Sequence, residues 1–358
     1  MKLLQIIPSL EIGGAQRLLS NLIPEFIKDN EVEILVFQKT GSDIEKEIEK
    51  LGVKINSLEV GLHSIKAIKG IRKYLKRFDL AHIHLFPANY FTVIANLGIN
   101  KPLLFTEHST HNKRRNYKIL KLPEKIVYSG MKKVACISLE TENNLRKWIS
   151  ETDREHTLVI HNGIDLQKFE KASSFKSEDF FGKKGKPVLM VSRFTHSKDH
   201  DTLIRALRHV KDNNVFIVFA GDGSLLQEKK QLVKNLGLEE RVIFLGARAD
   251  IPQIIKSSLI GVQSSHWEGF GLTAIEMMAG GIPVIVNDTD GLKQVTGDGA
   301  LVFKTGDEKQ LAGLIEKLIE DADLYKEMQL KGKKRSGLFS IKETARKYLD
   351  LYQKLISG

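Results

Sequence analysis

The sequence predicts an α/β protein with two doubly wound parallel sheets, and three observations support this. Short β-branched runs alternate with helical patterns along the whole chain, as in parallel strands joined by helices. The 358 residues exceed one average domain of roughly 100 to 200 residues, so two domains are expected. A polar stretch rich in glycine and lysine, residues 170–186, interrupts the pattern near the middle and predicts a linker.

We therefore predict an N-terminal Rossmann-like domain over residues 1–168 and a C-terminal one over residues 169–340, followed by an amphipathic helix within 341–358. The expected strands of the first domain are Leu3–Ile7, Val32–Phe37, Val53–Leu58, Leu80–Leu85, Leu103–Thr106, Val134–Ile137 and Leu158–Ile160. Those of the second domain are Val188–Val191, Val215–Ala220, Val242–Leu245, Ile260–Gln263, Val284–Val286 and Leu301–Phe303.

Composition narrows the class of protein. Hydrophobic residues make up 42% of the chain and charged residues 28%, which indicates a folded globular protein. The single cysteine, Cys136, excludes an internal disulfide and favours a reducing compartment. Residues 1–8 are too short for a signal peptide, and no apolar run approaches the roughly 20 residues of a membrane span. We expect a cytoplasmic protein that can contact the inner face of the cell membrane peripherally.

A glycine-rich turn between a strand and a helix is the most informative stretch. Gly269 and Gly271 let the backbone approach a ligand closely, and the N–H groups that open a helix near Leu272 favour a phosphate. Glu268 and Glu276 flank this turn, and carboxylates accept paired hydrogen bonds from vicinal hydroxyls. Phosphate and hydroxyl recognition together describe a nucleotide sugar.

The same residues have a simpler interpretation. Thr273 and Glu276 have the spacing of a capping box, which would make Glu276 a helix-start residue, and Glu268 could be a solvated loop residue. For Glu276 alone, the cap is the favoured interpretation.

A resemblance favours the ligand interpretation. The run from Glu268 to Glu276, with its continuation Met-Met-Ala-Gly-Gly-Ile-Pro-Val, resembles the E-x7-E signature of the family 4 glycosyltransferases of the GT-B fold. This resemblance implies two Rossmann-like domains facing a central cleft, a donor domain at 169–340, and a final helix that crosses back to an acceptor-side first domain. It implies a catalytic role for Glu268 and donor binding by Gly269, Phe270, Gly271, Leu272, Thr273 and Glu276.

A second motif follows the first strand of the second half. Arg193 and Lys198 stand five residues apart in a loop, a spacing that usually means a solvated pair. An arginine fork and a lysine point charge can also neutralise a diphosphate without a metal ion. The spacing matches the family's diphosphate-binding pair, so both residues are expected in the catalytic site.

Two stretches of the first half match the family less closely. Gly13 and Gly14 lie between the first strand and a helix, and they resemble the family's Gly-Gly element that faces the donor diphosphate. This chain carries Gln16 where relatives have an acid, so the role of that acid is open here. His108 follows the fifth strand where the family places a histidine beside the donor sugar, so the resemblance implies a catalytic role for it, and His111 is a weaker competitor.

Further turns of the second half fit the rim of a nucleotide pocket. Gly221 follows a strand, and the stretch around Arg248 is where relatives hold the base through backbone contacts. Asp288 and Asp290 could hold Mg²⁺ on charge grounds, but a solvated turn is favoured. We expect neither a metal ion nor a cofactor, with the nucleotide sugar as co-substrate.

We therefore predict a retaining hexosyltransferase that moves a sugar from a nucleotide diphosphate sugar, with UDP favoured, to an acceptor hydroxyl. The resemblance implies bacterial surface polysaccharide or glycolipid synthesis. A nucleotide-sugar epimerase of the same fold is the alternative, and a basic nucleic-acid-binding protein is another, because the pI is near 9.4. Aromatic residues make up only 7% and are not interleaved with the basic clusters, which argues against nucleic acid. No G-x-G-x-x-G follows an expected strand, which argues against an NAD enzyme.

Two basic runs predict contact with an anionic membrane surface. Residues 62–78 combine an apolar helical stripe with six Lys and Arg residues and no acid, and residues 112–133 contain eight Lys and Arg residues against Glu124 alone. A helix that packs its apolar face on a sheet and solvates its lysines would give the first pattern too. With membrane contact, the acceptor would be a lipid-linked or cell-surface glycan.

Overall fold

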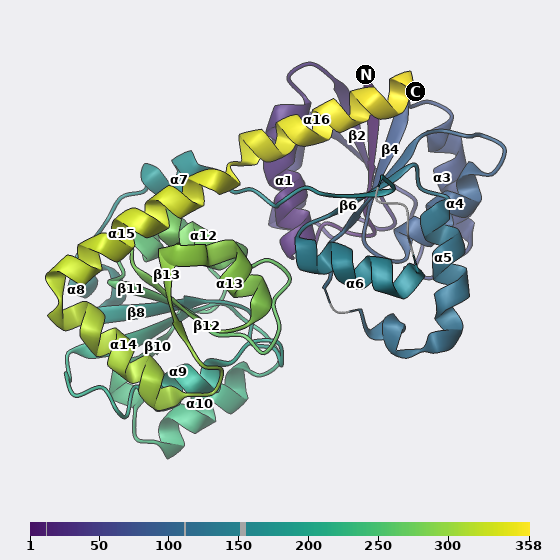
Figure 1. Cartoon of the computed structure of the whole chain (residues 1–358). Helices are drawn as coiled ribbons and strands as arrows, with labels where there is room; N and C mark the ends of the chain where they lie inside the picture. Colours follow the sequence, from purple (N-terminus) through teal and green to yellow (C-terminus); the bar gives the residue numbers. More distant parts are fainter. Residues whose placement is uncertain (12, 111, 151–154) are drawn as a thin grey trace. The chain divides into compact units, whose positions relative to one another are not determined.

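The computed structural model describes residues 1–11, 13–110, 112–150 and 155–358 (Figure 1). The chain divides into two compact units. The first unit consists of Met1–Gly163 together with Ile341–Gly358, and the second consists of Ile164–Ser340. Each unit has its own parallel sheet with helices on both faces, as the sequence predicts.

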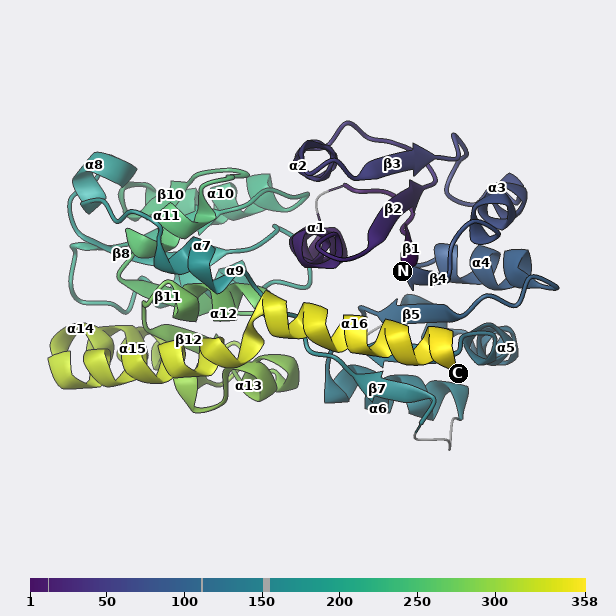
Figure 2. The ribbon, with the colours of Figure 1, turned by 90° about the horizontal axis from the view of Figure 1, so that it is seen from above.

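The first unit contains seven parallel strands in the order β3-β2-β1-β4-β5-β6-β7 (Figure 2). Side chains of α1, α2 and α16 join the hydrophobic core on one face of this sheet, and those of α3, α4, α5 and α6 join the core on the other. The strands are β1 (Lys2–Ile6), β2 (Glu31–Val36), β3 (Lys54–Ser57), β4 (Leu80–His84), β5 (Leu103–Glu107), β6 (Lys133–Cys136) and β7 (Thr157–Val159), and the helices are α1 (Gly14–Phe26), α2 (Asp43–Lys50), α3 (Lys66–Leu75), α4 (Ala88–Asn96), α5 (Lys121–Ser129), α6 (Leu139–Ile149) and α16 (Ile341–Ser357).

The second unit contains six parallel strands in the order β10-β9-β8-β11-β12-β13. All thirteen expected strands are confirmed, and their ends differ from the expected ones by at most two residues. The strands are β8 (Lys186–Val191), β9 (Val215–Ala220), β10 (Val242–Phe244), β11 (Ile260–Gln263), β12 (Val284–Asn287) and β13 (Ala300–Phe303), and the helices are α7 (Leu166–Glu170), α8 (Ser177–Phe181), α9 (His200–Ala206), α10 (Leu226–Asn235), α11 (Ile251–Lys256), α12 (Leu272–Ala279), α13 (Asp290–Thr296), α14 (Glu308–Glu320) and α15 (Ala322–Ser336).

The polar stretch 170–186 packs on the second unit although its composition predicts a linker. Its α8 ends in the buried Phe181, whose ring meets Phe216 edge-on at 6.2 Å between centroids. Upstream, the Phe175 N–H donates to Ser257 Oγ at 3.0 Å. Aromatic side chains therefore anchor a segment whose lysines and glycines suggested a free connection.

The last helix, α16, belongs to the first unit, as the resemblance implies. Its Tyr348 and Tyr352 are buried, and both rings contact Phe26 of α1 edge-on, with centroids 6.4 and 5.6 Å away. The chain thus crosses from the second unit back to the first between Ser340 and Ile341. Over the residues that the structure describes, no helix combines the length and apolar character needed to cross a bilayer.

Candidate functional site

Sheet order in the second unit brings the Arg193–Lys198 loop beside the glycine-rich turn. Strands β8 and β11 are neighbours and parallel, so the loops that follow them leave the same edge of the sheet. An isolated antiparallel bridge joins Lys198 to Ser265, and the His266 N–H donates to Ser197 O at 3.0 Å. Backbone hydrogen bonds therefore fix the two loops against each other.

Two predicted catalytic residues meet at this junction. Lys198 Nζ forms an ion pair with Glu268 Oε2 and also lies 3.3 Å from Ser265 Oγ. Only 17% of the Lys198 side chain and 18% of the Glu268 side chain are exposed, so the pair is largely shielded from water. An ammonium and a carboxylate held together at the carboxyl edge of a parallel sheet are placed to bind a ligand with anionic and hydroxyl groups.

Arg193 lies at the start of the same loop, and its side chain is exposed. Within the part of the chain that the structure describes, its guanidinium makes no hydrogen bond or ion pair. The next residue, Phe194, is buried and stacks on His200 with 4.1 Å between ring centroids. A buried neighbour thus anchors the loop, while the arginine fork remains available for an anion.

The turn before α12 has the geometry of an anion site. Gly271 is the N-cap residue with φ +84°, and the first intrahelical bond runs from the Ala274 N–H to Gly271 O at 3.0 Å. Among the described residues, the N–H groups of Leu272 and Thr273 have no hydrogen-bond partner. These two groups are orphan donors at the positive end of the helix dipole, which favours a phosphate there.

The capping-box interpretation of Thr273 and Glu276 is wrong. The N-cap is Gly271, which has no side chain, so Thr273 lies inside the first turn and Glu276 one turn further along. The backbone turns into the helix two residues earlier because Gly271 adopts the left-handed conformation, which glycine tolerates. Glu276 is partly buried on this helix.

Gly271→Ala is expected to lower the free energy of unfolding by about 1–3 kcal/mol, because a non-glycine residue is strained at this φ. The new Cβ would also lie 2.6 Å from Leu292 Cδ2. Chemical denaturation measures the change. The matched control is Gly313→Ala within α14, where a Cβ meets nothing within 4 Å. This control should stabilise the protein by roughly 0.5–1 kcal/mol; equal effects of the two variants would contradict the strain at Gly271.

The turn after β9 lies against the same loop. The Gly221 N–H donates to Gly246 O at 2.8 Å, and a Cβ at Gly221 would lie 2.0 Å from Ser192 O, so only glycine fits at its φ of +149°. Arg248 instead forms a bidentate pair with Asp250, at 2.7 and 2.6 Å. Its side chain is thus occupied, which leaves the backbone contacts that the resemblance implies.

The remaining residues of the turn and the possible Mg²⁺ pair have structural partners. Phe270 is buried, and its ring meets Phe339 edge-on at 5.5 Å, while Gly269 is partly buried. The Asp288 carboxylate accepts from the Thr305 N–H at 2.9 Å and from its hydroxyl at 2.6 Å, and these bonds lower the pKa of Asp288. Asp288 therefore ties the loop after β12 to Thr305, in line with the favoured turn interpretation.

The predicted residues of the first unit lie at the carboxyl edge of its own sheet. Gly13 is the N-cap of α1 and Gly14 its first residue. Gln16 Nε2 lies 3.4 Å from Ser9 O, so the residue that replaces the family's acid folds back on the preceding loop. His108 directly follows β5, and His111 lies outside the described residues.

Sequence reasoning missed two histidines beside His108. His84 Nδ1 lies 3.1 Å from His108 Nε2, and the rings of His82 and His84 are 4.1 Å apart between centroids. Burial lowers the pKa of His108 to about 4 and lowers the pKa values of His82 and His84 well below the usual value. All three rings are thus neutral at pH 7. Two histidines at alternate positions of an otherwise apolar strand were the available signal.

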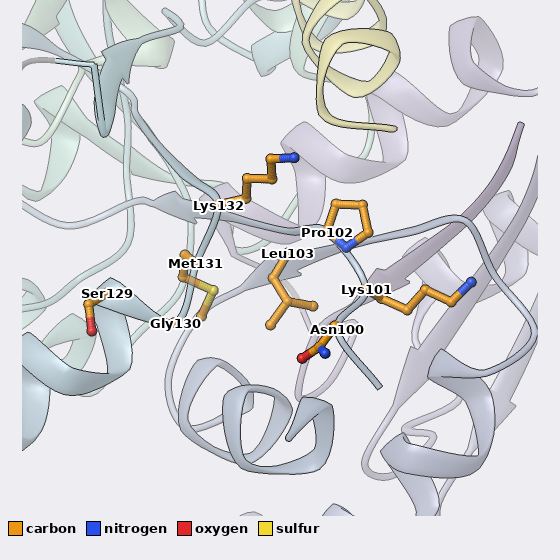
Figure 3. A pocket seen from close by; sticks show the side chains of 8 residues that line it. All are labelled: Asn100, Lys101, Pro102, Leu103, Ser129, Gly130, Met131 and Lys132. Atoms are coloured by element: carbon orange, nitrogen blue, oxygen red, sulfur yellow. The ribbon is translucent and has the colours of Figure 1, made fainter. Parts of the chain in front are cut away.

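A cavity of about 240 Å³ lies elsewhere in the first unit (Figure 3). The residues that line it precede β6 and precede or begin β5, so it lies at the amino ends of these strands, opposite the edge that carries His108. Ligands of open parallel sheets bind beyond the carboxyl ends, so we do not assign the cavity to the donor. Its lining consists of Asn100, Lys101, Pro102, Leu103, Ser129, Gly130, Met131 and Lys132.

Two family models match the two halves of the chain. Residues 12–168 match the model described as Glycosyltransferase Family 4, and residues 172–335 match the model described as Glycosyl transferases group 1. Each half of the chain therefore contains a glycosyltransferase domain, of family 4 in the first half and of group 1 in the second. The two Rossmann-like sheets agree with the GT-B type of fold, which consists of two such domains.

Individual relatives agree with this class. The "GalNAc-alpha-(1->4)-GalNAc-alpha-(1->3)-diNAcBac-PP-undecaprenol alpha-1,4-N-acetyl-D-galactosaminyltransferase" of Campylobacter jejuni is 28% identical over 98% of this chain and 98% of its own. The "UDP-Gal:alpha-D-GlcNAc-diphosphoundecaprenol alpha-1,3-galactosyltransferase" of Escherichia coli is 28% identical over 64% of this chain and 63% of its own. The crystal structure of Anabaena HepE in complex with UDP and glucose shares the fold, with a TM-score of 0.86, 20% identity and 99% of each chain covered. The comparisons therefore favour sugar transfer over the epimerase and nucleic-acid alternatives.

Proposed function

We propose that this protein transfers a hexose from a nucleotide diphosphate sugar, with UDP as the favoured nucleotide, to an acceptor hydroxyl with retention of anomeric configuration. The observation that carries the proposal is the Lys198–Glu268 pair, shielded from water beside the open N–H groups of α12. In this proposal, the groups that bind the diphosphate and those that bind the sugar hydroxyls lie at the same edge of the sheet.

The proposed donor-binding roles rest on the resemblance and on the chemistry of each group. Lys198, Arg193 and the first N–H groups of α12 would neutralise the diphosphate as it leaves with the electron pair of the glycosidic bond. Glu268 would accept hydrogen bonds from the sugar, and Glu276 from the ribose. The resemblance assigns donor binding also to Gly13, Gly14 and His108, which belong to the first unit, and to Gly221, Arg248, Gly269 and Phe270, which belong to the second.

Retention rests on the resemblance to family 4. In the mechanism that it implies, the departing diphosphate helps to deprotonate the acceptor hydroxyl on the same face of the sugar. The new bond then forms on the side that the leaving group vacates. Side-chain and backbone charges at α12 stabilise the developing negative charge, and the proposal includes no metal ion.

The nature of the acceptor is inferred from the relatives. The Campylobacter and Escherichia relatives are named for substrates linked to undecaprenol through a diphosphate. We extend that class to this protein and propose a lipid-linked glycan acceptor in surface polysaccharide or glycolipid synthesis. The nucleotide in the HepE complex is UDP, which supports UDP here.

A panel of UDP-, GDP- and ADP-sugars tests the donor proposal. We expect at least one UDP-sugar to raise the unfolding temperature and to release UDP slowly, with no loss of either effect in a chelator. Protection by no nucleotide sugar would remove the proposal. Release of an epimerised sugar nucleotide without acceptor would instead support an epimerase.

We further propose that the first unit docks on anionic membrane, and the structure changes which residues carry this proposal. In the run 62–78, α3 buries Ala67, Ile71 and Leu75, so its apolar face packs on the core. Arg72 donates to the carbonyls of Ala95 and Leu97, at 2.9 and 2.7 Å, and is a structural residue. The exposed cations of this helix are Lys66, Lys69 and Lys73.

The run 112–133 offers the stronger surface. Arg114 pairs with buried Glu124 at 2.8 Å and Arg115 with Glu107 at 3.0 Å, so neither is available to lipid. Between Arg115 and β6, exposed lysines alternate with large exposed apolar residues. We name the following set the docking segment: Tyr117 (65% exposed), Lys118, Ile119 (83%), Leu122 (67%), Lys125 and Ile126 (61%). Apolar insertion and roughly 1 kcal/mol from each lysine near an anionic leaflet would give loose, reversible binding.

Replacing Ile119, Leu122 and Ile126 by Ser is expected to lower co-sedimentation with anionic liposomes at least several-fold, because each exposed side chain loses apolar contact with the lipid. Lys118→Glu with Lys125→Glu should abolish the dependence on anionic lipid. The matched control is Leu330→Ser on α15, which is 71% exposed in the second unit. Equal binding of neutral and anionic vesicles, or an equal loss in the control, would contradict this surface.

A further inference from the structure

A row of polar side chains crosses the sheet of the first unit on the face that α16 covers. Gln5 of β1 pairs in register with His82 of β4, and His84 pairs with Thr106 of β5. All four are buried, with at most 1% of each residue exposed. Buried polar groups are nearly always hydrogen-bonded, so each bond in this row needs one donor and one acceptor.

One branch of the row runs from α16 to His108. Tyr352 Oη lies 2.6 Å from His82 Nδ1 and accepts from Gln5 Nε2 at 3.4 Å. Gln5 Oε1 lies 3.0 Å from His84 Nε2. His84 Nδ1 in turn lies 3.1 Å from His108 Nε2.

The other branch ends inside the core. His82 Nε2 lies 2.7 Å from Thr106 Oγ1, which lies 3.1 Å from the Tyr348 hydroxyl. Tyr348 and Tyr352 stand one turn apart on α16 and are equally buried. Only the hydroxyl of Tyr352 is bonded directly to Gln5.

The direction of each bond follows from the chemistry of neutral imidazole, which donates from one nitrogen and accepts at the other. Gln5 Oε1 can only accept, so His84 must carry its proton on Nε2. His84 Nδ1 is then an acceptor, and His108 must donate to it from Nε2. The bare nitrogen of His108 is therefore Nδ1, which has no hydrogen-bond partner within the described ranges.

A second arrangement would reverse every proton. If the Gln5 amide presented Nε2 to His84, then His84 Nε2 would accept that hydrogen bond and the His84 proton would lie on Nδ1. His84 Nδ1 would then donate to His108 Nε2, which would leave the His108 proton on Nδ1. Tyr352 opposes this reversal. Gln5 Nε2 donates to its hydroxyl oxygen at 3.4 Å, which turns Gln5 Oε1 toward His84.

We propose that Gln5 and Tyr352 are positioning residues that hold His108 in the Nε2–H tautomer and so present Nδ1 as a hydrogen-bond acceptor for a hydroxyl of the bound sugar. The part concerning the sugar rests on the proposed function. The tautomer itself does not, because it follows from bonds within the first unit. The last helix of the chain thereby sets the chemistry of a residue at the edge of the sheet.

The test combines long-range ¹⁵N–¹H spectra of histidine-labelled protein with kinetics. His108→Ala assigns the resonances. In the wild type at neutral pH, His108 should appear as the Nε2–H tautomer. Gln5→Leu removes the acceptor and Tyr352→Phe the hydroxyl that orients the amide, so both should give a mixture of tautomers. If the first variant fails to fold, the second still decides the outcome.

In both variants we expect kcat to fall by roughly 10-fold to 100-fold, which is the effect of removing a residue that orients a metal-ligating histidine through a hydrogen bond. The KM of the donor should change less. The matched control is Tyr348→Phe, which removes an equally buried hydroxyl from the same helix outside the Gln5 branch and should leave tautomer and kcat unchanged. An unchanged Nε2–H signal in Gln5→Leu and Tyr352→Phe would overturn the proposal. Full activity of His108→Ala, with the tautomer still dependent on Gln5, would overturn only the contact with sugar.

Discussion

Glu268→Gln is expected to lower kcat by about 10²-fold to 10³-fold, in the range seen when one preorganised group of a transition-state site is removed. The amide preserves the size of the side chain but offers one acceptor oxygen instead of two, and it loses the charge that holds Lys198. The variant should still unfold cooperatively, since the backbone bonds between the two loops remain. Steady-state release of nucleotide, with thermal unfolding beside it, measures both effects.

A matched control separates the site from a general effect of charge. Glu327 pairs with Lys331 at 2.7 Å on the exposed face of α15, so Glu327→Gln also breaks a lysine–glutamate pair of the second unit. This control should retain a normal rate. A near-normal rate for Glu268→Gln would remove Glu268 from the candidate site.

Arg193→Ala is expected to lower kcat/KM by about 10²-fold, which corresponds to a loss of transition-state stabilisation on the order of 3 kcal/mol. The reason is that the arginine stabilises the charge that develops on the diphosphate. Its fork makes no bond within the described chain, so the truncation should leave the free energy of unfolding almost unchanged. Arg205→Ala is the control, since Arg205 is an exposed arginine on α9 and its loss changes the net charge equally. An unchanged kcat/KM for Arg193→Ala would return this residue to the class of solvated surface charges.

The sheets were predictable because their signal is local. Buried parallel strands read as short β-branched runs, and every expected strand is present, including Val215–Ala220, all of whose residues are buried. The start of α12 at Leu272 is also confirmed, as the glycine-rich turn predicts. The capping-box interpretation would have placed it two residues later, but a left-handed Gly271 ends the turn before Thr273 can act as a cap.

Contacts between distant residues were the part of the site that the sequence did not disclose. Arg193, Lys198 and Glu268 were each expected, but the ion pair between Lys198 and Glu268 joins residues 70 positions apart through the neighbouring positions of β8 and β11. The link from Tyr352 to His82 spans 270 positions. Such pairs depend on strand order and on the return of α16, which no local pattern encodes.

Charge counting overstated the basic surface for a related reason. A lysine or arginine in a basic run is counted as exposed, yet Arg72 donates to two carbonyls and Arg114 lies 4.0 Å over the Phe86 ring. The guanidinium group satisfies buried acceptors and stacks on aromatic rings, so arginines in such runs often have structural roles. The exposed apolar residues at 117–126 were not singled out, because exposure cannot be inferred from a mixed basic and apolar pattern alone.

The most direct test of the central claim is the configuration of the product. The protein is incubated with the α-linked UDP-sugar that the donor panel identifies and with a lipid-linked glycan acceptor, and the new linkage is assigned by NMR. Our account predicts an α-linked product, which Glu268→Gln should form at about 10²-fold to 10³-fold lower rate. A β-linked product would contradict retention, and the absence of any glycosylated product across the acceptors would contradict sugar transfer by the site at α12.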